Sequence, residues 1–228
     1  MQFDNLLYLI EIFSDLEPET VNQIAATCNW QRYGKGQEVI SQKEESTDVF
    51  FVVEGRVSAI GYSREGKEVT YSEIGRGELF GEFSALDEKP RSAAIKTLEE
   101  SHIGQMSASR FREILLAYPS ISLKLLEQIV SKNRYLTERI FEFSTLAVRH
   151  RVCAELMRMV DPDKVFDDRF SIEPAPSHYQ IATRLSTHRE AVTRELSALS
   201  QQEIVEVGRQ KIHILSVNKL AKLAQSQL

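Results

Sequence analysis

The chain has 228 residues, of which 42% are hydrophobic, and a formal net charge of −5. This length allows one large domain or two small ones, and the composition supports a buried core. No apolar run is long enough to cross a bilayer, and the two cysteines, Cys28 and Cys153, lie in no CxxC pair and near no histidine cluster. We therefore expect a cytoplasmic protein with no membrane contact and no bound metal, and we interpret both cysteines as buried, inert thiols.

Charge is distributed unevenly along the chain. From Val148 onward there are 12 lysines and arginines against 10 acidic residues, whereas the preceding part carries 16 against 23. The net charges of the two parts are therefore +2 and −7. The C-terminal third is the part better suited to approach a polyanion, although so small an excess would not by itself indicate nucleic-acid binding.

The N-terminal part is typical of short antiparallel strands. Nine of the ten glycines lie at or before Gly104. Short helices are expected around Asn5–Phe13 and Pro18–Cys28. Strand-like runs separated by turns follow at residues 48–53, 56–60 and 69–71. This spacing predicts an antiparallel barrel or roll, after which a helix opens with Ser107 or Ser109 as its N-cap.

The run Phe80–Leu86, followed by Pro90–Ala94, contains residues suited to binding one small phosphate ester. Gly81 has no Cβ, so the backbone can approach a ligand closely, and the N–H groups that follow it would point at an anion. Glu82 can accept hydrogen bonds from a sugar hydroxyl. Arg91 can clamp phosphate oxygens with charge-assisted bonds, and Ser92 adds a hydroxyl.

After Pro119 the pattern becomes that of a long helix with a heptad seam. Steps of three and four residues connect Leu126, Ile129, Asn133, Leu136, Ile140, Phe143 and Ala147. A seam of three heptads after a complete β unit favours a partner chain over packing on its own domain. The polar Asn133 can fix register and oligomeric state, and the simplest closed arrangement is a two-fold homodimer. We assign to this interface Leu126, Ile129, Asn133, Leu136, Ile140 and Phe143.

The C-terminal part contains a second motif. A helix is expected at 149–160, ended by Asp161-Pro162, and a loop with one or two short strands at 161–176. Two short helices at 177–185 and 187–199 follow, separated by a tight turn. Ser177 and Gln180 form a capping-box pattern, and Thr187 is a second candidate cap. Strand-like runs at 204–207 and 212–215 predict a hairpin, so the whole segment resembles a winged helix-turn-helix.

The exposed face of the second short helix carries side chains that can read base edges: His188, Arg189, Glu190, Thr193 and Arg194. Arginine can pair with guanine O6 and N7, and glutamate can accept from cytosine N4. At the tip of the hairpin, Arg209 and Lys211 can hold phosphates, which adds affinity without sequence choice.

With both motifs in this order, nearly the full length of the chain resembles the cyclic-AMP receptor protein (Crp/Fnr) family of transcriptional regulators. The resemblance implies an α+β fold with three parts: a cyclic-nucleotide-binding β-roll at 1–118, a dimerisation helix and connector at 119–147, and a winged helix-turn-helix at 148–228. It implies no catalysis, a half-site like TGTGA in an inverted repeat of double-stranded DNA, and RNA polymerase as a partner. It assigns the cyclic phosphate and ribose to Gly81, Glu82, Phe83, Ser84, Arg91 and Ser92.

One departure from the family concerns the purine. In the cyclic-AMP receptor, neighbouring threonine and serine side chains on the long helix meet the base, whereas this chain has Leu136 and Thr137 there. Asn133, one turn earlier, can supply an amide, so we assign Asn133 and Thr137 to the ligand. Cyclic AMP is favoured, and cyclic GMP or recognition of both remains open.

Other branches of the family, and other classes of protein, give the alternatives. The oxygen-sensing branch carries an N-terminal cysteine cluster that this sequence lacks, so we expect no iron–sulfur cluster. We also expect no heme, because we interpret His102 and His150 as ordinary surface or core histidines. A regulator of the same family could be constitutive or answer another ligand. A cyclic-nucleotide regulatory subunit of an enzyme would share the roll but lack the helix-turn-helix.

Overall fold

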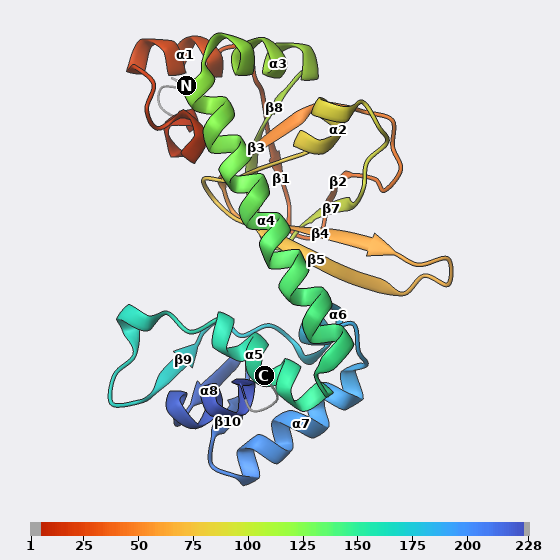
Figure 1. Ribbon diagram of the computed structural model, residues 1–228, viewed down its shortest axis with the longest axis vertical. Coiled ribbons are helices and arrows are strands. Elements are labelled where there is room, and N and C mark those ends of the chain that lie inside the picture. The colour runs from red at the N-terminus through yellow and green to blue at the C-terminus, as the bar shows by residue number, and fades with distance from the viewer. Residues whose placement is uncertain (1–5, 226–228) are drawn as a thin grey trace. The chain divides into compact units, whose positions relative to one another are not determined.

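The computed structural model describes residues 6–225, which form two compact units that divide between Asn133 and Arg134 (Figure 1). The division falls inside one long helix, α4 (Pro119–Thr145). The sequence-based boundaries at 118 and 147 stay a prediction. The α+β class, with a strand-rich first unit, a long helix next and a mainly helical C-terminal unit, is confirmed.

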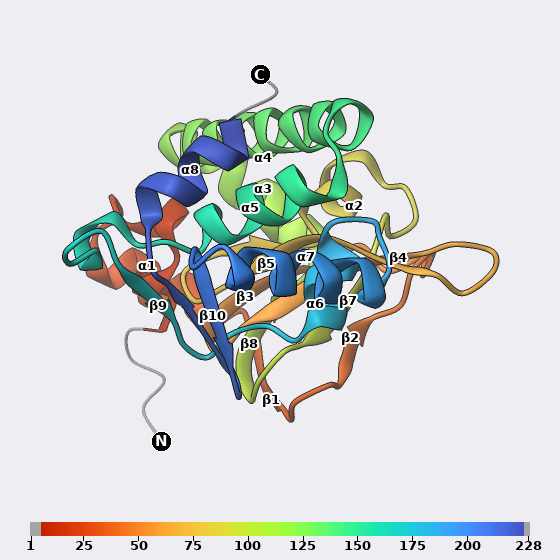
Figure 2. The same cartoon turned by 90° about the horizontal axis from the view of Figure 1, so that it is seen from below.

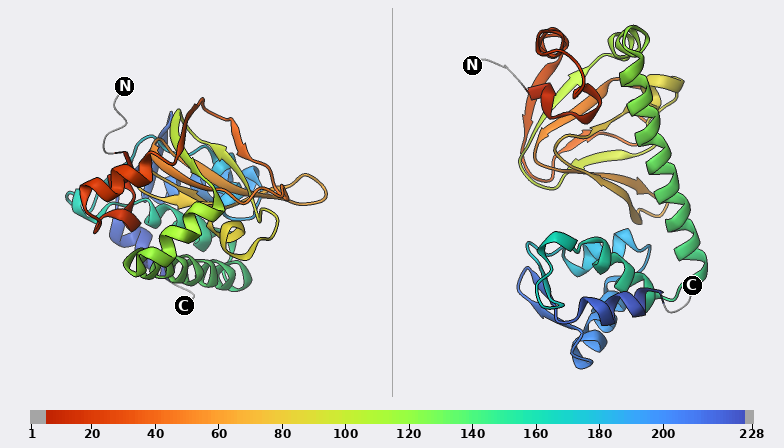
Figure 3. Two further views of the ribbon diagram at one scale, coloured as in Figure 1. Left: turned by 90° about the horizontal axis from the view of Figure 1, so that it is seen from above. Right: turned by 60° about the vertical axis from the view of Figure 1, so that its left-hand side comes forward.

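The first unit contains two four-stranded antiparallel sheets (Figure 3). One sheet has the order β1-β8-β3-β6 and the other β2-β7-β4-β5. Their strands are β1 (Asn29–Tyr33), β2 (Glu38–Ile40), β3 (Val49–Glu54), β4 (Val57–Tyr62), β5 (Glu68–Ile74), β6 (Leu79–Phe80), β7 (Ala94–Thr97) and β8 (Ser101–Met106). The predicted antiparallel roll is therefore confirmed, while β1, β2, β6, β7 and β8 had no sequence prediction.

Strand β3 explains how this unit is packed. Its side chains alternate between two hydrophobic clusters, because successive residues of a strand point to opposite faces. Val49, Phe51 and Val53 join the cluster under the helices, while Phe50 and Val52 join the cluster between the sheets. Full burial of each large apolar side chain stabilises the unit by about 1.5–3 kcal/mol. The continuous apolar run of this strand follows from its burial on both faces.

Helices cover one side of this roll. They are two 3₁₀ turns (Leu6–Leu9 and Glu11–Phe13), α1 (Pro18–Ala25), α2 (Glu82–Asp87) and α3 (Ala108–Ala117). Ser107 caps α3 by accepting from the backbone N–H of Arg110, as one of the two sequence candidates predicted. Asn5, where the first helix was expected to start, lies outside the described residues. Within residues 6–225 no single helix has the length and apolarity for a membrane span; α3 and α4 would pass only as a pair bent by 112°.

The second unit combines helices with a small sheet (Figure 2). Its elements are α5 (Val148–Arg158), β9 (Phe170–Ile172), α6 (His178–Arg184), α7 (Arg189–Gln201), β10 (Val205–Gly208), β11 (Lys211–Ile214) and α8 (Val217–Gln225), with a 3₁₀ turn at Pro162–Lys164. The sheet order is β10-β11-β9. The helix α8 was missed by the sequence analysis, although it packs on α5.

Local signals place the two helices α6 and α7. The capping box of Ser177 and Gln180 is present, with both reciprocal bonds formed. The N-cap of α7 is His188, whose side chain makes no capping bond, so the alternative cap Thr187 is not used. Buried Ile181, Val192 and Leu196 join α6 and α7 to the core of the unit.

Candidate functional site

Arg91 is the centre of the first candidate site. The residue is only 4% exposed, and its guanidinium is hydrogen-bonded on all three nitrogens. Nε donates to Ser46 Oγ at 3.0 Å, Nη1 to the Gly81 carbonyl at 3.1 Å and Nη2 to the Asp48 carbonyl at 2.8 Å. Its Cζ also lies 5.7 Å from the ring centre of Phe50. These contacts account for three of the five N–H donors of an arginine.

The loop before β3 holds Arg91 in place, which the sequence analysis did not foresee. The backbone N–H of Arg91 donates to the Glu44 carbonyl at 2.9 Å, and the Lys43 N–H donates to the Arg91 carbonyl at 3.1 Å. Asp48 is itself fixed, because Gln105 Nε2 donates to its Oδ2 at 2.6 Å. Residues 43–48 and 91 are too far apart in sequence for a local motif to have shown this pairing.

Electrostatics around Arg91 are balanced by nearby carboxylates. Burial lowers the pKa of Arg91, and the charges of Glu44, Asp48 and Glu82 act in the opposite direction. Hydrogen bonds from the Ser46 side chain and the Ser41 backbone, and after them the charge of Arg91, lower the pKa of Glu44. The guanidinium stays charged at any physiological pH, because the pKa of arginine starts so high.

Gly81 occupies a position that no other residue fits. Its φ is +85°, in the left-handed region, and it is the N-cap of the short helix α2. A Cβ at this position would lie 2.7 Å from the Asp48 carbonyl oxygen and 2.8 Å from Arg91 Nη1. The glycine therefore permits the close approach of its backbone to the arginine.

Glu82 is also buried, at 4% exposure, and has a partner that was not predicted. Lys132 of α4 reaches it, with Nζ 2.8 Å from Oε1. The pair connects α2 to the long helix within the first unit. A signal was present in the sequence, because Lys132 follows Ile129 by one helical step of three, and Ile129 packs against the core of the roll.

The structure brings only some of the predicted ligand residues together. Gly81, Glu82 and Arg91 converge, and the buried Ser84 lies on the same short helix. Phe83 is 45% exposed, and Ser92 is exposed as well. Asn133 and Thr137 lie on the exposed side of α4. The roles of these residues in ligand binding remain predictions.

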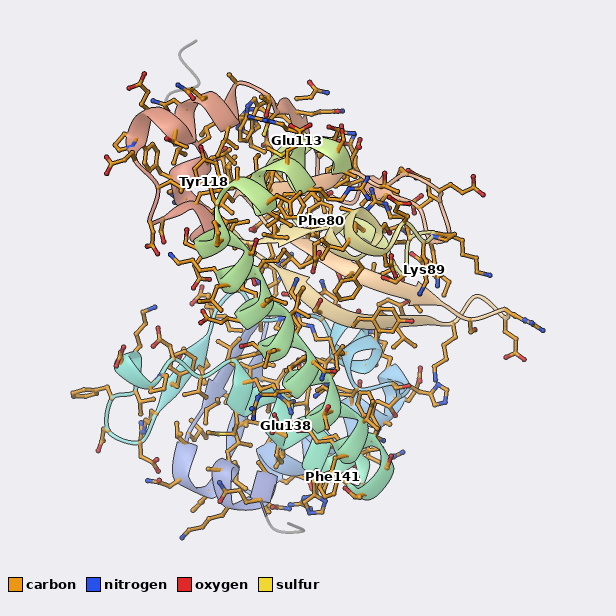
Figure 4. The ribbon with its side chains drawn as sticks, turned by 45° about the horizontal axis from the view of Figure 1, so that its top comes forward. Phe80, Lys89, Glu113, Tyr118, Glu138 and Phe141 are labelled. Carbon is orange, nitrogen blue, oxygen red and sulfur yellow. The ribbon has the colours of Figure 1, made fainter. Side chains whose placement is uncertain are left out.

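The long helix α4 presents an apolar stripe to the outside. Leu126 is 58% and Ile140 is 66% exposed, and Leu136 is exposed as well. Phe141 and Glu138 also project from the helix (Figure 4).

Two of the predicted seam residues lie differently. Ile129 packs partly against the roll, and Phe143 is half-buried beside two arginines. Exposed residues that follow one another in steps of three and four are Leu123, Leu126, Val130, Asn133, Thr137 and Ile140, and we call them the exposed stripe. The dimer seam itself stays a prediction.

The second candidate site lies on α7. Arg189, Glu190, Thr193 and Arg194 line a shallow, open hollow on this helix, and all four are exposed. His188, the N-cap, is exposed beside them. Thr193 Oγ1 donates to the Arg189 carbonyl at 3.0 Å and lies 2.8 Å from Nδ1 of His178. Burial lowers the pKa of His178, and the positive charge of Arg189 lowers it further.

The hairpin after α7 carries the remaining basic residues. Gly208 and Lys211 pair across β10 and β11, which leaves Arg209 and Gln210 as its tip. Arg209 is exposed. Lys211 is engaged by a residue that the sequence analysis did not consider, with its Nζ 2.6 Å from Glu173 Oε1. A phosphate contact of Lys211 would therefore compete with this ion pair.

Two family models match the chain, one in each unit. A cyclic nucleotide-binding domain matches residues 30–118, which include Gly81, Glu82 and Arg91. A Crp-like helix-turn-helix domain matches residues 150–223, which include all of α6, α7 and the hairpin. The two matches define the class: a nucleotide-binding module joined to a DNA-binding module in one chain.

Relatives extend over almost the full length. The chain is 25% identical over 213 residues to the cyclic AMP receptor protein of Thermus thermophilus, covering 93% of this chain and 96% of that protein. The chain belongs to the Crp/Fnr family of transcription regulators, proteins that bind DNA and carry a cyclic-nucleotide-binding domain.

Solved structures show the same fold. A CooA mutant from Carboxydothermus hydrogenoformans superposes with a TM-score of 0.81 at 22% identity, covering 95% of each chain. The c-di-GMP-responsive regulator CLP of Xanthomonas campestris gives a TM-score of 0.75 at 17% identity, covering 88% of this chain and 99% of the other. At these identities the likeness concerns the fold alone.

Proposed function

We propose that this protein is a dimeric transcription factor that answers a cyclic nucleotide, with cyclic AMP favoured over cyclic GMP, and binds an inverted-repeat DNA site. The observation that carries the proposal is the geometry of Arg91, a buried arginine directed at the backbone of Gly81. A cyclic nucleotide has one phosphodiester charge, which one guanidinium can neutralise with paired hydrogen bonds.

Hydrogen bonds to the protein hold the Arg91 side chain in one conformation. Three of its N–H groups bind Ser46, Gly81 and Asp48, and these bonds fix the plane of the guanidinium. We assign the two remaining N–H groups to the phosphate oxygens. Because the side chain is already ordered, binding would lose little additional rotamer freedom.

Glu82 offers a route from the ligand to the long helix. A ribose hydroxyl that donates to Glu82 would share this carboxylate with Lys132, whose Nζ lies 2.8 Å away. Lys132 belongs to α4, so any change in this ion pair reaches that helix directly. The ligand can shift the equilibrium between two arrangements only by binding one of them better.

The exposed stripe on α4 supports the dimer. Its members recur in steps of three and four, and leucine, valine and isoleucine at such positions pack against an identical helix in coiled coils. Asn133 and Thr137 lie on this same stripe, so we place their contact with the purine at the junction of the two subunits. Two-fold symmetry then presents two copies of α7 to half-sites about 34 Å apart.

Base reading falls to the exposed residues of α7. We assign direct contacts with base edges to Arg189, Glu190 and Arg194, supported by His188 and Thr193, and contacts with phosphates to Arg209 and Lys211. The exposure of Arg189, Glu190 and Arg194 supports the base-reading role, because a major-groove contact needs side chains that can reach the base edges. RNA polymerase is proposed as a further partner on family grounds.

A second candidate is a regulator of the same fold that is constitutive or answers another ligand. It is favoured by one observation, namely that protein acceptors take three of the N–H groups of Arg91, so that only two are left for a phosphate. The two candidates differ in a simple experiment. Isothermal titration with cyclic AMP and cyclic GMP, followed by gel shifts with and without each nucleotide, should show binding and a nucleotide-dependent shift. Nucleotide-independent DNA binding would support the second candidate instead.

A further inference from the structure

A cluster of charges with a buried centre lies within the second unit, where α4 ends and α5 and α6 approach it. It comprises Arg139, Glu142, Glu155, Arg158 and Arg184. Arg139, Glu142 and Glu155 are each at most 6% exposed. Buried ion clusters are weak stabilisers, since replacing them with apolar residues is often neutral or stabilising. The cluster therefore points to a role besides stability.

The two glutamates hold one arginine from each of three helices. Nη1 of Arg139, from α4, donates to Glu142 Oε2 at 3.0 Å and to Glu155 Oε2 at 3.5 Å. Arg158, from α5, pairs with both glutamates, at 3.3 Å in the case of Glu155. Arg184, the last residue of α6, lies 3.3 Å from Glu155 Oε1 through its Nη1.

Arg139 also contacts the backbone at the end of α6. Its Nη2 donates to the carbonyl of Arg184. Arg151, from α5, donates through Nη1 to the next carbonyl, that of Leu185, at 2.9 Å. The last carbonyls of a helix lack intrahelical partners and favour a positive charge, so the two arginines cap this helix from outside.

The two capping arginines are organised around one aromatic ring. The ring centre of Phe143 lies 4.8 Å from Cζ of Arg139 and 5.6 Å from Cζ of Arg151. Nε of Arg151 is buried without a hydrogen-bond partner in the part of the chain that the structure describes. A buried N–H group without a partner costs stability, which argues that the half-buried Arg151 is kept for its bond to the Leu185 carbonyl.

The two capped carbonyls begin the turn that leads to α7. After Leu185 come Ser186, which has a positive φ of +50°, Thr187, and the N-cap His188. Because this connection is so short, its first carbonyls determine where α7 starts. We propose that Arg139 and Arg151 are positioning residues that let the end of α4 set the direction of α7. This inference rests on the proposed function, since it assumes that α7 reads the DNA bases.

The test compares Arg139→Met with Arg134→Met, which removes an exposed arginine from the same helix. Hydrogen exchange of the amides at 186–188 should accelerate about tenfold or more in Arg139→Met, relative to amides of the α7 interior, and stay unchanged in Arg134→Met. Affinity for a duplex with inverted TGTGA half-sites, measured with cyclic AMP, should fall about tenfold, a factor equivalent to about 1.4 kcal/mol. Affinity for cyclic AMP should stay within about twofold of the wild-type value.

Each outcome is decisive. Unchanged exchange in the turn, or exchange that rises uniformly over the second unit, would overturn the proposal and leave a merely structural cluster. Unchanged DNA affinity in Arg139→Met would also overturn it. If the wild-type protein itself ignores the duplex, the proposed function fails, while the exchange measurement still decides the role of Arg139. Should Arg139→Met not fold, Arg151→Met is judged by the same criteria. Arg139→Lys keeps the positive charge but loses the two-pronged guanidinium. Its hydrogen exchange at 186–188 and its DNA affinity should lie between those of the wild type and Arg139→Met.

Discussion

The two units of this protein treat their functional arginines in opposite ways. In the roll, Arg91 is buried and already bound to three protein acceptors. On α7, Arg189 and Arg194 stand exposed around an open hollow. A small anion makes few contacts, so its binding is favoured by a donor that is already ordered and loses little entropy. A DNA duplex makes many contacts, and its bases and phosphates are reached by exposed side chains. The difference matches the two kinds of ligand that we propose.

The largest effect is expected for Arg91→Ala. Removing a buried, hydrogen-bonded charge partner typically costs 2–5 kcal/mol or more, so nucleotide affinity should fall by roughly a factor of 30 to several thousand. Calorimetry with cyclic AMP measures this loss. The exposed Arg76→Ala in the same unit serves as the control and should bind normally. Retained affinity in Arg91→Ala would show that the pocket is wrongly assigned.

Gly81→Ala should have the next largest effect in the roll, a loss of stability against unfolding. The new Cβ would meet the Asp48 carbonyl at 2.7 Å, at a backbone φ of +85°. A non-glycine residue in such a conformation costs roughly 1–3 kcal/mol, and the clash adds to it.

Gly36→Ala separates the two causes. Gly36 has a similar φ of +79° but nothing within 4 Å of the added Cβ. In thermal unfolding, Gly81→Ala should lose clearly more stability than Gly36→Ala. Equal losses would mean that backbone strain alone matters and that the approach to Arg91 does not.

Glu190→Ala tests the exposed site. It should reduce discrimination at one base pair by about 1–3 kcal/mol, because the carboxylate would no longer accept from a cytosine amino group. Since losing any negative charge favours DNA, the exposed Glu206→Ala is the control for that general effect. Binding titrations on matched and singly altered duplexes measure the difference. Equal changes on both duplexes would argue against base reading.

The smallest effect concerns the thiols, of which each unit has one. Cys153 is buried as predicted, whereas Cys28 is only half-buried, because it lies just after the end of α1. Burial raises the pKa of Cys28 to about 12 and that of Cys153 to about 11. At pH 8 the thiolate fraction should then be about one in a thousand or less, against roughly a quarter for an unperturbed thiol. Both should react slowly with a disulfide reagent until the protein is unfolded. Rapid reaction of the native protein would contradict the raised pKa of that thiol.

The sequence predicted the parts that depend on neighbours along the chain. The capping box of Ser177, the cap of Ser107 and the α6–turn–α7 segment are confirmed because their bonds join residues three or four apart. The strand β3 was likewise predicted from its local run of apolar residues, although that run did not reveal that the two faces of the strand pack into different clusters.

Long-range partners could not be predicted in the same way. Lys132 meets Glu82 across 50 positions, and Arg91 meets Ser46 and Asp48 through a loop with no motif of its own. The heptad count assigned Ile129 to the dimer seam and could not show that this side chain also packs partly against the roll of its own chain. Such long-range contacts are determined by how the elements pack in three dimensions. The periodicity of apolar residues along one helix shows which face can be buried, but not which residues it contacts.

The most direct test of the whole account is the affinity for cyclic AMP measured with and without operator DNA. If the ligand site and α7 belong to one switch, DNA must tighten nucleotide binding by the same factor by which the nucleotide tightens DNA binding. We predict such a gain, about 5- to 150-fold for a typical coupling of 1–3 kcal/mol. Identical nucleotide affinities in both titrations would show that the two units act independently and would contradict the account.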